Sequence, residues 1–185
     1  MAEGNAKTLK DLTSESFGLI IAFLLPGLVA IIALSFWSGR IKEVLKSFLS
    51  EKANVNLFLL VIIAALAIGL LITSLRALIF EKWARVAEPL SANDFAALAS
   101  SDKFAAFRGA VDAHYRYHQC WGGLVIVLPV LYLGWLKETY IAAISSTYSI
   151  FILPTLCFVV FEAASTWAAC EAYKNYVNRA RAILK

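Results

Sequence analysis

The feature that most constrains this chain is a series of long apolar stretches that are almost free of charge. The stretches are residues 17–37, 55–80, 121–136 and 140–169. Within them only Arg76 and Glu162 are charged. A helix that crosses a bilayer needs about twenty mostly apolar residues. Only helices and closed barrels satisfy their backbone hydrogen bonds without water, and the alternating pattern of a membrane barrel strand is absent. The sequence therefore predicts an all-α protein, a bundle of four transmembrane helices.

Composition supports a membrane location. Hydrophobic residues make up 61% of the 185 residues and charged residues 16%, whereas soluble domains are about half apolar and a quarter charged. The N-terminal 16 residues are polar, and the apolar run after them is too long for a signal peptide and lacks a small-residue cleavage site. We therefore expect the first apolar stretch to remain as a span.

The basic residues predict the orientation. With four spans, twelve of the seventeen Lys and Arg residues fall on the side of both termini and five on the other. The positive-inside rule then places both termini in the cytoplasm. The predicted layout is a cytosolic segment 1–16, a hairpin of spans 17–80 with an outer loop 38–54, a cytosolic helical segment 81–120, a hairpin of spans 121–170 and a basic cytosolic tail 171–185.

Local signals add detail to this layout. Glu88-Pro89-Leu90-Ser91 should end the helix that leaves the second span, and Ser91 with Asp94 is typical of a capped helix start. Apolar residues from Phe104 onward recur at helical spacing, so we expect one helix to run into the third span. In the outer parts, residues 41–49 favour a short interfacial helix, and a tight connection is expected near residues 137–139.

Glu162 is the sharpest functional signal, because charged residues inside membrane helices usually face the bundle or water. At 100° per residue it shares one helix face with other polar residues. The stripe comprises Tyr148, Thr155, Glu162, Thr166 and Tyr173. One interpretation is a face that lines a pore or contacts another subunit. The other is a buried seam of hydrogen bonds between helices of one bundle.

Arg76 is a candidate ion-pair partner for Glu162. Arg76 lies 21 residues after Val55, and Glu162 lies 21 residues after Ile141. If both helices begin at the outer surface, the two charges reach a similar depth, where pairing offsets part of the burial cost of each. The alternative is that Arg76 extends to the cytosolic headgroups.

Basic and imidazole side chains on the cytosolic side are candidates for sensing a signal. They are His114, Arg116, His118, Arg179 and Arg181. His114 and His118 lie one helical turn apart, but a metal site needs more ligands, so no metal is predicted. The aromatic residues around the histidines favour an interfacial role. The basic tail favours attraction to anionic lipid, with a small nucleotide-type ligand as the alternative.

Small residues mark faces where helices can approach closely, among them Ala65 with Gly69 and the pair Gly122-Gly123. The sequence carries none of the common nucleotide-binding or catalytic motifs, so neither an enzyme nor a cofactor is expected. A four-helix bundle encloses no pathway of its own, and transport would therefore require a homo-oligomer.

Two segments carry a resemblance. They are Phe23-Leu24-Leu25-Pro26-Gly27-Leu28 and Tyr115-Arg116-Tyr117-His118-Gln119-Cys120-Trp121-Gly122-Gly123. Together with the four-span layout, these segments resemble the small membrane proteins of bacterial antiviral defence operons. That resemblance implies a multi-pass protein of the bacterial inner membrane that acts as a membrane-disrupting effector or a phage sensor.

Two functions therefore stand as expectations. The first is a homo-oligomeric, signal-gated channel or pore-like effector embedded in the lipid bilayer. The second is a membrane scaffold or sensor subunit that recruits a soluble cytosolic partner through residues 81–120.

Overall fold

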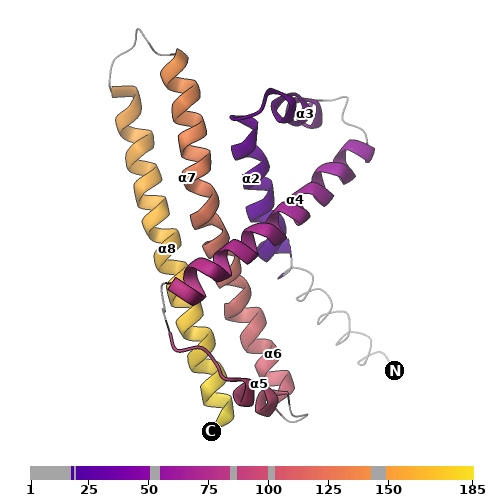
Figure 1. Ribbon diagram of the computed structural model, residues 1–185, viewed down its shortest axis with the longest axis vertical. Coiled ribbons are helices and arrows are strands. Elements are labelled where there is room, and N and C mark those ends of the chain that lie inside the picture. Colours follow the sequence, from indigo (N-terminus) through magenta and orange to yellow (C-terminus); the bar gives the residue numbers. More distant parts are fainter. Residues whose placement is uncertain (1–17, 19, 51–54, 84–86, 100–102, 143–148) are drawn as a thin grey trace, which may run out of the picture.

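The computed structural model describes residues 18, 20–50, 55–83, 87–99, 103–142 and 149–185, all of them in helices or short connections (Figure 1). The side chains of residues 81–83, 141, 142, 149 and 150 are outside this description. The helices follow in the order η1 (Ile20–Leu24), α2 (Leu25–Ser35), α3 (Gly39–Leu49), α4 (Val55–Arg76), η2 (Ala77–Trp83), α5 (Ala92–Leu98), α6 (Phe104–Ala110), η3 (Val111–Tyr115), α7 (Arg116–Ala142) and α8 (Ser149–Leu184), where η marks a π-helical segment. The described residues contain no strand, which confirms the all-α prediction.

Three helical stretches are long and apolar enough to cross a bilayer. They are Val55–Phe80, Phe104–Tyr140 and Phe151–Leu184. The first predicted span is present as a shorter apolar helix, Ile20–Ser35, which continues η1 into α2. The second, third and fourth predicted spans therefore have the required length within the described residues. The first predicted span stays a prediction.

The first apolar helix crosses α4 at very close range. A Cβ added to Gly27 would strike the backbone carbonyl of Ala65, and one added to Gly69 would strike the carbonyl of Phe23. Ala65 itself is fully buried. The small residues predicted to form a packing face in the second span therefore do so, against η1 and α2.

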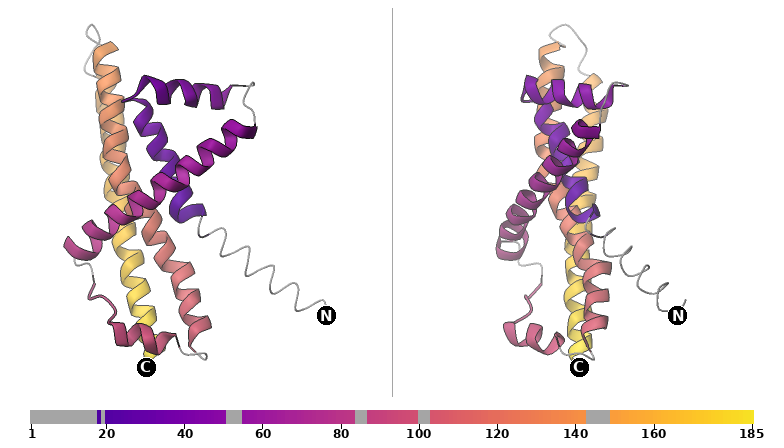
Figure 2. Two further views of the ribbon diagram at one scale, coloured as in Figure 1. Left: turned by 45° about the vertical axis from the view of Figure 1, so that its right-hand side comes forward. Right: turned by 90° about the vertical axis from the view of Figure 1, so that its right-hand side faces the viewer.

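Helices α7 and α8 run antiparallel along the long axis of the molecule, and α4 passes across them at a steep angle (Figures 1 and 2). The predicted turn near residues 137–139 is wrong, because α7 continues as helix to Ala142. Two contacts join this polar part of α7 to earlier residues: Lys42 of α3 forms an ion pair with Glu138, and the Lys137 ammonium lies 5.0 Å from the Trp37 ring centroid. The connection to α8 falls outside the described residues.

The opposite end of the molecule is built from α5, α6 and η3, which pack on the last turns of α8 (Figure 2). Leu90 and Leu98 join Tyr173, Tyr176 and Val177 in one buried cluster there. The predicted cap of α5 is confirmed, since the Asp94 amide donates to Ser91 Oγ at 3.1 Å and the Ser91 amide to the Asp94 carboxylate at 2.8 Å. Ser100-Ser101-Asp102, whose residue types are also typical of a helix start, lie outside the described residues.

The continuous helix from Phe104 into the third span is also confirmed, with η3 as a wider turn between α6 and α7. Its apolar residues Phe107, Val111 and Tyr115 pack against the α8 cluster. These three residues of the segment are therefore covered, at least in part, by the same chain.

Candidate functional site

A buried arginine at the end of α4 anchors the polar interior of the bundle. Arg76 is only 1% exposed. Space for its side chain comes from α7, where a Cβ on Gly122 would lie 2.8 Å from both Cγ and Cδ of Arg76. The double glycine noted in the sequence therefore serves to admit a charged side chain as well as a neighbouring helix.

His118 of α7 joins Arg76 to α8. It is fully buried, with Nε2 at 2.5 Å from Arg76 Nη1 and Nδ1 at 2.8 Å from the Ala169 carbonyl oxygen. Arginine can only donate and a carbonyl can only accept. His118 must therefore be the neutral tautomer that carries its proton on Nδ1, donates to Ala169 and accepts from Arg76. One imidazole thus links three helices.

Aromatic rings surround this pair. The His118 ring centroid lies 4.9 Å from that of Tyr173, 6.0 Å from Tyr115 and 5.8 Å from Phe80. The Arg76 guanidinium carbon lies 5.7 Å from the Tyr115 ring centroid, within the range of a cation–π interaction. The rings cover the imidazole, and the Tyr115 ring adds a favourable contact to the guanidinium charge.

The contacts of Arg76 with His118, and of His118 with Ala169, differ from the sequence-based prediction that Arg76 and Glu162 lie at equal depth and form a pair. That prediction began the fourth helix at Ile141, whereas α8 begins at Ser149. Arg76 accordingly meets α8 near Ala169, and Glu162 lies seven residues earlier, about 10 Å at 1.5 Å per residue. Arg76 does not extend to the surface either, since its side chain is buried against His118.

Two members of the predicted polar stripe on α8, Thr155 and Tyr173, face α7. Thr155 Oγ1 lies 2.7 Å from the Tyr132 hydroxyl and donates to the Phe151 carbonyl at 2.5 Å. Tyr173 is buried beside His118. These contacts match the interpretation of a seam between helices. Tyr148, the first member of the stripe, lies outside the described residues.

The middle of the stripe is different. Glu162 is half-buried, and its Oε2 is covered by protein yet has no hydrogen-bond partner in the described part of the chain. Beside it a shallow hollow of about 570 Å³ opens along α8, lined among others by Thr166, Trp167 and Cys170. Trp167 is 70% exposed. The carboxylate therefore lies at the border between the packed side of α8 and an open face.

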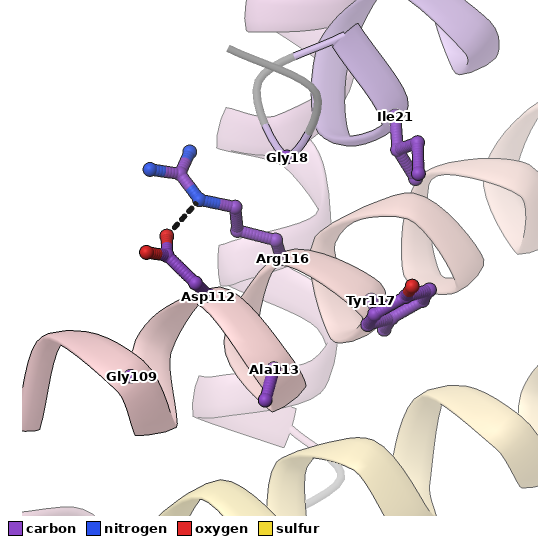
Figure 3. A pocket seen from close by; sticks show the side chains of 7 residues that line it. All are labelled: Gly18, Ile21, Gly109, Asp112, Ala113, Arg116 and Tyr117. Atoms are coloured by element: carbon purple, nitrogen blue, oxygen red, sulfur yellow. Dashed lines mark hydrogen bonds and ion pairs between the residues drawn. The ribbon is translucent and has the colours of Figure 1, made fainter. Parts of the chain in front are cut away.

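The predicted sensing residues fall at the opposite end from α3. Arg116 Nε donates to Asp112 at 2.6 Å, and both line a cavity of about 410 Å³ with Gly18, Gly109 and Tyr117 (Figure 3). Arg181 donates to the Glu88 carboxylate at 3.1 Å. His114 is half-buried and Arg179 is exposed. Of the five candidates, only His118 enters the buried site, so the structure does not gather them into one sensing surface.

Sequence reasoning missed the link between Arg76 and His118. The signal was present in Gly122-Gly123, one turn after His118, but the register between α4 and α7 was needed to use it. The described residues hold no cluster of three metal-ligating side chains. Their three cysteines, Cys120, Cys157 and Cys170, are all free thiols. Comparison with family models, curated proteins and solved structures finds no match to this chain.

Proposed function

We propose that this protein is a homo-oligomeric, signal-gated pore of the bacterial inner membrane, with four spans and both termini in the cytoplasm. The resemblance to small membrane proteins of antiviral defence operons suggests that it acts as an effector there. The sidedness rests on the twelve-to-five distribution of basic residues.

The unpartnered carboxylate of Glu162 carries the proposal. A charged carboxylate at the centre of a membrane helix costs roughly 2.5–3.5 kcal/mol on insertion scales unless protein or water receives it. The chain supplies no hydrogen-bond partner to Glu162 Oε2 among its described residues. Rotation of the Glu162 side chain into the hollow beside it would bring the carboxylate to a second copy or to a column of water at the open face of α8. Several copies that place Glu162 and Thr166 around a common axis would provide both a neighbouring subunit and a column of water.

The buried link between helices supports gating from the cytosolic end. The tyrosine cluster formed by Tyr115, Tyr173 and Tyr176 lies between α5–η3 and α8, with the Tyr115 and Tyr176 centroids 4.9 Å apart. His118 contacts two of these three rings and also holds Arg76 of α4. A displacement of α5 or α6 would therefore move α8 and α4 together, which is the coupling that a signal-gated pore needs.

Ion efflux from proteoliposomes tests the proposal. Purified protein is reconstituted over a range of protein-to-lipid ratios, and potassium release is followed alone and after addition of mono-, di- and cyclic dinucleotides. We expect release from the unchanged protein and a loss of at least about tenfold in Glu162→Ala, since a pore-lining carboxylate concentrates cations.

Glu171→Ala is the matched control, because Glu171 is an exposed carboxylate on the same helix outside the hollow. It should keep the release of the unchanged protein. The proposal fails if no condition produces release, or if Glu162→Ala and Glu171→Ala release potassium equally well.

A further inference from the structure

A second hollow, separate from the Glu162 face, opens where α3 lies across the ends of α2 and α4. It has a volume of about 340 Å³ and is lined by three helices. Leu34 comes from α2, Arg40 and Val44 from α3, and Leu60 and Ala64 from α4. In Figure 2 α3 closes the triangle between the other two helices.

The chemistry of the lining is one cation above an apolar wall. Arg40 is the only lining residue that is charged or polar. Its side chain is exposed, and it forms no ion pair within the part of the chain that the structure describes. The wall is open to the surroundings, since Val44 is 43% exposed and Leu60 59% exposed.

The position of α3 indicates how deep in the bilayer this hollow lies. Ile41, Leu45 and Phe48 pack on α2 and α4, while Lys42 and Lys46 lie away from that contact. A helix with one apolar and one basic face lies in the plane of the headgroups. Arg40 is then level with lipid phosphates. The α4 wall from Leu60 to Ile68 extends about 12 Å toward the hydrocarbon core at 1.5 Å per residue.

We propose that this hollow binds one anionic phospholipid, with its phosphate on Arg40 and one acyl chain along α4. A guanidinium pairs with phosphate through two parallel hydrogen bonds, and the apolar wall matches a hydrocarbon chain. The lipid would hold α3 against α2 and α4 and brace the outer end of their crossing. The site is independent of the proposed pore, so its test and the efflux test can fail separately.

Native mass spectrometry of the full chain, released from mixed micelles, measures the binding. Micelles contain either phosphatidylglycerol or phosphatidylcholine of the same acyl chains. We expect a one-lipid adduct at higher occupancy with phosphatidylglycerol, reduced at least fivefold in Arg40→Gln. Lys46→Gln is the matched control, because Lys46 lies on the same helix outside the hollow, and it should stay within twofold.

A second variant tests the acyl-chain contact. Val44→Trp fills the hollow from an exposed position and should reduce the adducts of both lipids without lowering the melting temperature. The proposal is overturned if Arg40→Gln and Lys46→Gln bind phosphatidylglycerol alike, or if Val44→Trp leaves both adducts unchanged. It is also overturned if Arg40→Gln abolishes a dimer instead of a lipid adduct, since the occupant would then be a second copy.

Discussion

Replacement of His118 by phenylalanine tests the buried link between α4, α7 and α8. Phenylalanine keeps the ring among its aromatic neighbours but removes both hydrogen bonds, to Arg76 at 2.5 Å and to the Ala169 carbonyl at 2.8 Å. A hydrogen bond to a charged group contributes about 1.5–3 kcal/mol and a neutral one about 1 kcal/mol. The expected loss is therefore about 3 kcal/mol, or roughly 6–12 °C in melting temperature for a chain of this size.

Thermal unfolding in detergent, followed by tryptophan fluorescence, measures this loss. His114→Phe is the control, because His114 is half-buried one turn earlier on the same helical stretch, and it should shift the melting temperature by no more than about 2 °C. Loss of one partner also leaves a buried charge, whereas replacement of both by apolar groups is nearly neutral. The double variant Arg76→Met/His118→Phe should therefore recover at least half of the loss. Melting of His118→Phe within about 2 °C of the unchanged protein, or strict additivity in the double variant, would refute the link.

Three further predictions follow from the packing. Gly69→Ala should destabilise the protein by about 1–3 kcal/mol, because the added Cβ strikes the Phe23 carbonyl. Gly39→Ala is the control and should not destabilise it, since the space around that Cβ is open. Equal melting temperatures of the two variants would contradict the close crossing of α4 with η1 and α2. Tyr132→Phe should cost only about 0.6 kcal/mol, since Thr155 keeps its bond to Phe151; a loss beyond about 2 kcal/mol would show that this contact is more than one hydrogen bond. The pKa of Asp94 lies below its ordinary value because the Ser91 amide donates to its carboxylate. The cap therefore stabilises α5 at pH values above the unfolded-state pKa of Asp94. This stabilisation is lost as the pH falls through the lower pKa of the folded state. Hydrogen-exchange protection of α5 should therefore decrease as the pH falls from about 5 to about 2 in the unchanged protein but not in Asp94→Asn. Equal pH dependence in both would contradict this cap.

Most of the helices could be predicted from the sequence because their signals are local. The uncharged run of α4, the helix from Phe104 into α7, the cap at Ser91 and the amphipathic α3 each depend on neighbours within a few turns. The end of α7 could not be predicted in this way. Lys137, Glu138 and Thr139 have the polarity of a turn, yet they are helical, and the first two contact Trp37 and Lys42, about a hundred residues earlier.

The candidate site shows the same limit. Sequence patterns singled out Glu162, Arg76 and His118 as unusual. The structure places Arg76 and His118 at contacts between helices, and Glu162 at the border between the packed side and the open face of α8. Which of them meet depends on the register of α4, α7 and α8. Backbone contact at Gly27 and Gly69 fixes α4 against η1 and α2, and the space that Gly122 leaves admits Arg76 of α4 beside α7. A single-helix pattern contains none of these contacts.

Cysteine cross-linking in native membranes tests most directly the claim that a second copy covers the Glu162 face of α8. Cys170 lines the hollow beside Glu162, whereas Cys157 lines a different hollow with Tyr132 and Pro154. At 100° per residue Cys157 lies about 140° from Glu162 around the helix and Cys170 about 80°. After oxidation, a variant that keeps only Cys170 should form covalent dimers, and one that keeps only Cys157 should not. Dimers through Cys157 alone, or no dimers through Cys170, would contradict an assembly built on this face.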